Sequence, residues 1–68
     1  MEIRISRYRK LDGHMGREYF KSQSNRIFCV EDGEWFQTCK QGEPQEELNV
    51  LAVEKINEDV YLLHFEYM

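Results

Sequence analysis

The feature that most constrains the fold is the dipeptide Asp32-Gly33, which separates two runs of β-prone residues, 26–31 and 34–40. Glycine accepts a positive φ freely, and aspartate tolerates it better than most residues do. The pair therefore favours a two-residue type I′ turn, the turn whose twist matches that of a β-hairpin. We expect a tight hairpin at the centre of the chain.

A two-residue turn also sets the register of this hairpin, because opposed residues are counted outward from the turn. Val30 then faces Trp35 on one side of the hairpin, and Cys29 faces Phe36 on the other. Large apolar side chains thus appear on both faces. We expect one face to pack in the core and the other to be covered over part of its length by a neighbour, a partner or an exposed patch.

Alternation of apolar and polar residues predicts further strands. The first runs from Glu2 toward Lys10, with an end or a bulge near Arg7, where the alternation loses its phase. The others are expected over 17–22, 48–56 and 60–68, the last two forming a hairpin around 57–59. A helix over 46–56 is the rival prediction, but its apolar residues cover too much of the circumference for an amphipathic helix. Pro44 could also begin a single helical turn near 44–48.

The register of this second hairpin places Leu51 opposite Phe65 and Val53 opposite Leu63, if its loop has three residues. These odd-numbered positions form the most apolar strand face in the chain, and we expect them in the core. The predicted fold is one all-β domain over 1–68, a mostly antiparallel meander of five or six strands. It closes into a small barrel or half-barrel of SH3-like shape, since closure hides sheet edges. An open sheet with one short helix is the alternative.

Charge is unevenly distributed along the chain. Residues 1–26 carry a net charge of +4 and residues 27–68 carry −8, which sum to the net charge of −4. No apolar run approaches the roughly 18–20 residues of a membrane span. The first residues also lack the apolar segment of a signal peptide, and two thiols in so short a chain suit a reducing compartment. We expect a soluble cytoplasmic protein with no membrane partner.

The spacing of potential ligands argues against metal chemistry. Structural zinc sites draw on close pairs of ligands, whereas Cys29 and Cys39 lie ten residues apart and His14 and His64 lie fifty apart. The hairpin register also directs the two cysteines to opposite faces, which opposes a disulfide. No catalytic motif is present, and a small barrel filled by its own side chains leaves little room for a pocket of roughly 300 Å³. We expect no metal, no cofactor and no catalysis.

Two binding hypotheses remain. The first is a small regulator or inhibitor that docks on a larger protein, with an aromatic anchor and acidic neighbours near the central turn: Trp35, Phe36, Glu31, Asp32 and Glu34. Aromatic rings are frequent hot spots in protein interfaces. A homodimer formed through an edge strand is a further alternative, because an unpaired strand edge can pair with a second chain.

The second hypothesis is single-stranded nucleic-acid binding by the basic N-terminal part of the chain. Cations can follow the phosphates while aromatic rings stack on bases. The residues that alternate in this way are Arg4, Arg7, Tyr8, Arg9, Lys10, Arg17, Tyr19, Lys21 and Arg26. Because the chain as a whole is acidic, and nucleic-acid-binding domains are usually basic, the sequence ranks this hypothesis second.

Overall fold

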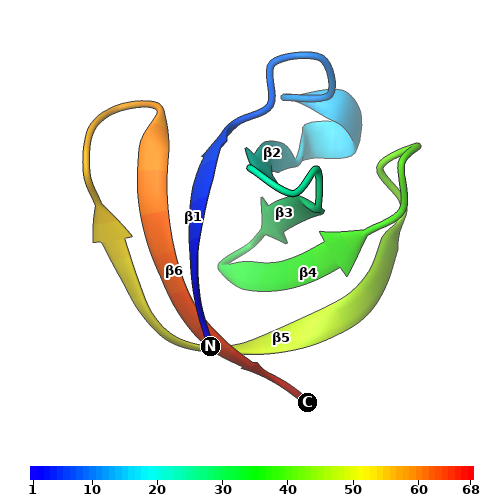
Figure 1. The fold of residues 1–68 in the computed structure, drawn as a ribbon. Helices are drawn as coiled ribbons and strands as arrows, with labels where there is room; N and C mark the ends of the chain where they lie inside the picture. The colour runs from blue at the N-terminus through cyan, green and yellow to red at the C-terminus, as the bar shows by residue number, and fades with distance from the viewer.

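Six antiparallel strands close into a barrel in the computed structural model, which describes residues 1–68 (Figure 1). The elements are β1 (Glu2–Arg7), a 3-10 turn η1 (His14–Gly16), β2 (Glu18–Ser22), β3 (Ile27–Glu31), β4 (Glu34–Thr38), β5 (Pro44–Lys55) and β6 (Val60–Tyr67). Each strand pairs with the next along the chain, and β1 pairs with β6 to close the barrel. The predicted all-β, antiparallel, SH3-like barrel is confirmed.

The β3–β4 hairpin has the predicted turn and register. Asp32 and Gly33 both adopt positive φ, at 51° and 79°, as a type I′ turn requires. Val30 pairs with Trp35 and Cys29 pairs with Phe36. The alternation along the two strands therefore sends Trp35 to the inside of the barrel and Phe36 to the outside.

The chain itself covers both faces of this hairpin. Inside the barrel lies the main core, which comprises Ile5, Phe20, Phe28, Trp35, Leu48, Leu63 and Phe65. A second cluster of Tyr19, Ile27 and Cys29 lies on the outer face, where Tyr8, Leu11 and Phe36 pack against it. The predicted cover is thus supplied by the loop over 8–17, which folds back across β2 and β3.

The predicted core face of the second hairpin is wrong in part. Val53 pairs with Leu63 as expected, but a β-bulge between Val50 and Ala52 shifts the register, so that Phe65 pairs with Val50 rather than with Leu51. A bulge adds one residue to one strand and reverses which residues face inward beyond it. Leu51 is consequently exposed, while Leu48 enters the core. Val53 keeps its predicted partner Leu63 but is also exposed, because β4 no longer pairs with β5 at this point.

The region around Pro44 forms a strand and not a helical turn. Pro44 begins β5 opposite Thr38, a position where a missing N–H is tolerated. The rival helix over 46–56 is also wrong, since β5 continues to Lys55. The 3-10 turn η1 is the chain's one helical element, and no helix has the length and apolar character that a membrane crossing requires.

Candidate functional site

The outer face of the β1–β2 pair carries polar and basic side chains. Ile5 points into the core, so its neighbours Arg4 and Ser6 point outward. Ser6 pairs with Lys21 on β2, and directly opposed residues of an antiparallel pair share one face of the sheet. Lys21 in turn pairs with Ile27 on β3. A row of side chains therefore crosses three strands on the outside of the barrel.

Two adjacent hollows lie along this row. One has a volume of about 410 Å³ and the other about 290 Å³. They share Tyr8, Lys21 and Asn25, so they form one continuous groove, which we call the basic groove. Arg4, Ser6, Arg7, Ser22 and Gln23 complete the lining of the first hollow, and Ile27 and Lys40 that of the second. The prediction that so small a barrel leaves little room for a pocket of roughly 300 Å³ is therefore wrong for its outer surface.

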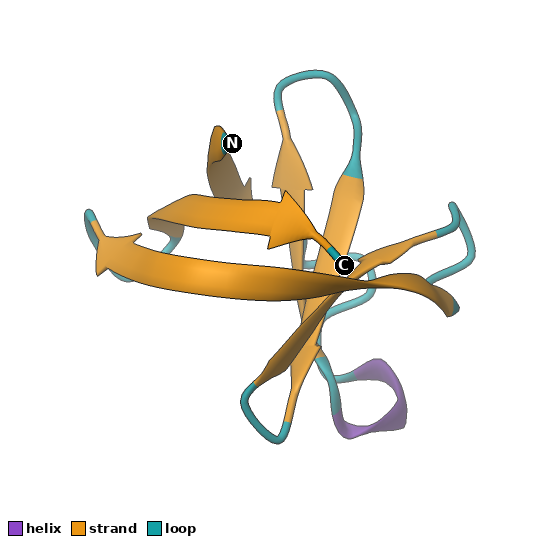
Figure 2. Ribbon diagram, turned by 90° about the horizontal axis from the view of Figure 1, so that it is seen from below, coloured by secondary structure: helices purple, strands orange, loops and turns teal.

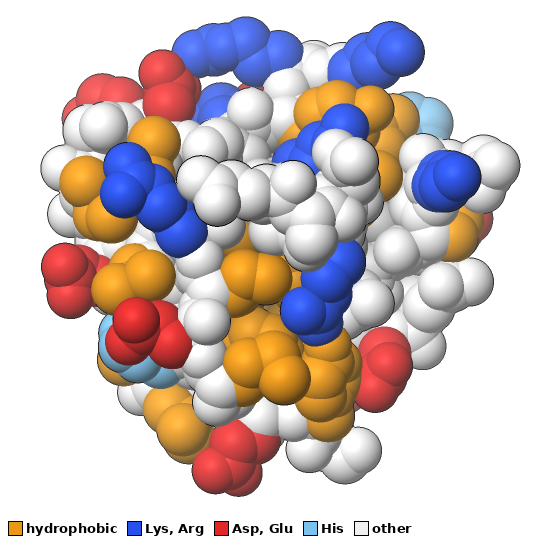
Figure 3. Space-filling model, viewed as in Figure 1, with side chains coloured by type: hydrophobic (Ala, Val, Ile, Leu, Met, Phe, Trp, Pro, Cys, Tyr) orange, Lys and Arg blue, Asp and Glu red, His pale blue; other side chains and the backbone are white.

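No carboxylate lines the basic groove. Three of its cations, Arg4, Lys21 and Lys40, also take part in none of the ion pairs of the structure. In the view of Figure 3, basic side chains lie along the upper edge, down the middle and at both sides of the molecule, and acidic ones lie toward its left, lower and right margins. The groove is thus a positively charged surface without its own counter-charges.

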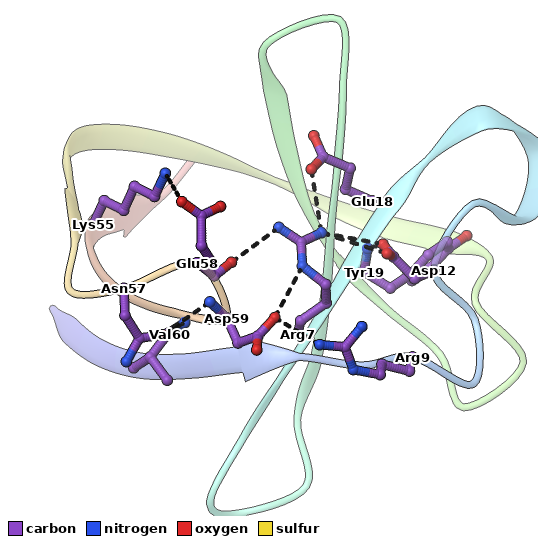
Figure 4. Close-up of polar contacts among 10 residues, drawn as sticks. All are labelled: Arg7, Arg9, Asp12, Glu18, Tyr19, Lys55, Asn57, Glu58, Asp59 and Val60. Atoms are coloured by element: carbon purple, nitrogen blue, oxygen red, sulfur yellow. Dashed lines mark hydrogen bonds and ion pairs between the residues drawn. The ribbon is translucent and has the colours of Figure 1, made fainter.

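Arg7, by contrast, is occupied within the fold (Figure 4). Its guanidinium lies 3.4 Å from Asp12, 3.2 Å from Glu18 and 3.8 Å from Asp59, and it stacks 4.9 Å above the Phe20 ring. Partial burial lowers the pKa of Arg7, but the hydrogen bond to Glu18 and the nearby carboxylates outweigh this effect and raise the pKa. Arg7 therefore ties β1 to the 8–17 loop, to β2 and to the β5–β6 turn.

The remaining predicted nucleic-acid contacts lie outside the groove. Arg9 pairs with Asp59 at 2.8 Å and Arg17 with Glu31 at 3.7 Å. Arg26 bonds to Gln37 and Tyr67, and Lys10 is exposed on the 8–17 loop. Tyr19 is fully buried and donates its hydroxyl hydrogen bond to the Gly42 carbonyl at 2.7 Å. The structure thus brings together Arg4, Arg7, Tyr8 and Lys21 and separates the others from them.

Tyr8 supports Lys21 within the groove. The Lys21 ammonium lies 4.8 Å from the centre of the Tyr8 ring, a distance at which a cation is attracted to the ring face. Tyr8 also packs against the second cluster. Its ring is therefore engaged within the chain, and it positions a cation at the junction of the two hollows.

Sequence reasoning missed the groove residues Ser6, Ser22, Gln23, Asn25, Ile27 and Lys40. Gln23, Asn25 and Lys40 lie between strands, in short segments that carry no pattern of their own, and Ser6, Ser22 and Ile27 lie on strands. The position of Lys40 could have been inferred from the sequence. The hairpin register sets Thr38 opposite Ile27, and Lys40 follows Thr38 by two residues, so it lies near the Ile27 end of the groove.

The acidic turn of the first hypothesis has no exposed anchor. Trp35 is only 8% exposed, with its ring 5.5 Å from that of Phe20, and Phe36 is half-buried in the second cluster. Both rings therefore belong to the chain's own cores, while Asp32 and Glu34 are exposed beside them. Docking on a larger protein stays a prediction, without these rings as its anchor.

Burial makes the thiol of Cys29 an unusually weak acid. Desolvation raises the pKa of the Cys29 thiol from 9.0 to about 11; the nearby charge of Arg17 lowers it and that of Glu31 raises it. The folded state therefore holds this proton after the unfolded chain has lost it. We expect the free energy of unfolding to fall as pH rises from 9.0 to about 11, by roughly 2 kcal/mol from this group alone.

Urea titrations at several pH values test this expectation against Cys29→Ala, which has no thiol at this position. The wild-type curve should lose more stability than the variant between the two pKa values. Equal losses would show that Cys29 titrates alike in the folded and unfolded chains.

No protein-family model, no curated protein and no solved structure matches the chain.

Proposed function

We propose that the chain binds single-stranded nucleic acid along the basic groove. The observation that carries this proposal is the continuous groove with three unpaired cations and no carboxylate in its lining. Phosphate oxygens are the natural counter-charges for such a surface, and the side chains of Ser6, Gln23 and Asn25 add hydrogen-bonding groups that phosphate and sugar accept.

The geometry favours contacts to the backbone over contacts to bases. Tyr8 holds Lys21 and packs on the second cluster, so it offers no free face on which a base could stack. Backbone contacts position a strand without reading its sequence. The hollow of about 410 Å³ is within the size range of ligand sites, so the groove has room for part of one flexible strand. The binding should therefore be largely independent of sequence.

Salt dependence tests the proposal. Three phosphate contacts on a single strand give a slope of about −2 for log affinity against log salt concentration. Affinity for a fluorescein-labelled oligothymidine or oligouridine of about twelve nucleotides should fall roughly 15- to 20-fold between about 50 and 200 mM salt. Fluorescence anisotropy measures both ligands, and unlabelled duplex DNA serves as a competitor. Absence of binding at the lower salt concentration, or an affinity that salt does not change, would refute the proposal.

A further inference from the structure

The second half of β5 is an open edge of the barrel. The pairing of β5 with β4 ends at Glu47, whereas its pairing with β6 continues to Lys55. Beyond Glu47 the strand therefore has a neighbour on one side only. This half lies at the left margin of Figure 1, and Figure 2 shows the β5–β6 hairpin projecting from the rest of the barrel.

Backbone groups along this edge are available for pairing. The N–H of Ile56 donates to the carbonyl of Val60 at 2.9 Å, so Ile56 bonds toward β6. In an antiparallel pair, alternate residues bond to the same neighbour. Glu54 and Ala52 are then the next residues that bond to β6, and Val53 and Lys55 direct their N–H and C=O groups away from it. No strand of the barrel lies on the side toward which these N–H and C=O groups point.

Apolar side chains accompany the free backbone groups. Leu51 is 59% exposed, and Val53 and Ile56 are each 44% exposed. Natural edge strands are usually short, charged or covered. Here the β-bulge leaves Leu51 without a partner on β6, so an apolar side chain stands at the start of the open edge. The edge thus combines unsatisfied backbone groups with apolar contacts, the two elements that β-strand addition uses.

The surroundings of the edge are acidic. The 44–68 segment contains Lys55 as its one Lys or Arg residue, and its acidic residues are Glu46, Glu47, Glu54, Glu58, Asp59 and Glu66. Lys55 is paired with Glu58 at 3.1 Å, and this hydrogen bond is the main cause that raises the pKa of Lys55. Asp59 is likewise paired, with Arg7 and Arg9. The negative charge that remains is that of Glu46, Glu47, Glu54 and Glu66, and a basic segment complements it.

A second copy of the chain fits this edge less well. Antiparallel pairing of two β5 strands around Val53 would bring together two acidic segments, in which Glu46, Glu47 and Glu54 take part in no ion pair of the structure. Like charges that face each other across strands are destabilising. The charges therefore favour a partner that differs from this chain.

We propose that the open edge of β5 accepts an extended, basic segment of another protein as an added strand. Apolar residues at alternate positions of that segment contact Leu51 and Val53, and its Lys or Arg residues face the acidic surroundings. This surface is separate from the basic groove, so the proposal is independent of nucleic-acid binding. It also gives the predicted docking on a larger protein a site that does not require Trp35.

A capped peptide of four Val-Lys repeats provides the probe, with amide chemical shifts of the labelled protein as the readout. Shift changes should be confined to 50–56 and to the facing part of β6. The matched control carries N-methyl groups on alternate residues, which preserve charge and side chains but remove the hydrogen bonds of one edge. A Val-Glu peptide of the same length tests the charge preference. Neither control should bind detectably where the Val-Lys peptide does.

Val53→Pro removes an outward N–H that bonds to nothing in the barrel, so it should preserve the fold and weaken the peptide at least tenfold. Val53→Lys is a second variant that keeps the backbone groups and adds a repulsive charge. Equal binding by wild type and both variants, or equal binding of the N-methylated peptide, would overturn the proposal. So would a sedimentation result in which the free protein is a dimer that Val53→Pro dissociates, because a second copy would then occupy the edge.

Discussion

Replacing Lys21 with glutamate is expected to weaken the binding of single-stranded nucleic acid by about 50-fold at low salt. Lys21 borders both hollows and makes no ion pair within the chain. At about 50 mM salt, each phosphate contact on a single strand contributes roughly a factor of eight through counterion release. Charge reversal removes one attractive charge and adds a repulsive one, so its effect on the logarithm of the affinity is about twice that of one contact. Lys21→Gln only removes the attractive charge, so its affinity should fall by close to a factor of eight.

The matched control is Lys55→Glu, which makes the same change in net charge on the β5–β6 hairpin. Lys55 lies at the end of β5, lines neither hollow and is already paired with Glu58 at 3.1 Å. Its reversal removes no contact to phosphate, so we expect a loss of affinity of at most about twofold, far below that of Lys21→Glu. If both reversals weaken anisotropy-detected binding equally, the ligand responds to the net charge of the protein and not to the basic groove.

Replacing Gly42 with alanine should give the largest loss of stability among exchanges of one methyl group. Gly42 has a φ of 93°, and an added Cβ would lie 3.1 Å from the Leu11 Cδ1 and 3.2 Å from the Tyr19 hydroxyl. Alanine there combines left-handed backbone strain with crowding of the second cluster. We expect a loss of about 2–4 kcal/mol in unfolding free energy, which lowers Tm by roughly 10–20 °C in a domain of this size.

Gly33→Ala separates these two effects. Gly33 also has a positive φ, at 79°, but an added Cβ there meets no atom within 4 Å. Its cost should be the backbone strain alone, about 1 kcal/mol. Circular dichroism melts of the two variants therefore measure how tightly the 8–17 loop closes over the second cluster. Equal melting temperatures would mean that this loop yields to the added methyl group.

The central hairpin was predictable because its information is local. Asp32 and Gly33 specify a turn, the turn specifies a register, and the register places Trp35 and Phe36 on opposite faces. The β-bulge near Leu51 was not predictable in this way. One extra residue in a strand of alternating apolar side chains leaves no signature in composition, yet it reverses which residues face the core.

The basic groove was only partly predictable, because its charge depends on contacts between distant segments. Arg7 and Arg9 belong to a basic stretch in the sequence, but the fold places Asp59 beside both. Lys40 appears isolated in the sequence, but the barrel places it in the lining shared by Tyr8 and Lys21. Counting charges along a chain does not reveal which of them the fold will neutralise.

Closure of the barrel by β1 and β6 has a consequence for the order of folding. Every other strand pair joins neighbours in the sequence, whereas this closure sets Glu2 opposite His64. Contacts between the ends of a chain require the greatest loss of chain entropy before they contribute stability, so they slow folding and tend to form late. The basic groove does not depend on this closure, because the β1–β2 pairing sets Ser6 opposite Lys21 and every lining residue precedes β5. A chain in which β1 to β4 have paired would therefore have its groove before β6 closes the barrel.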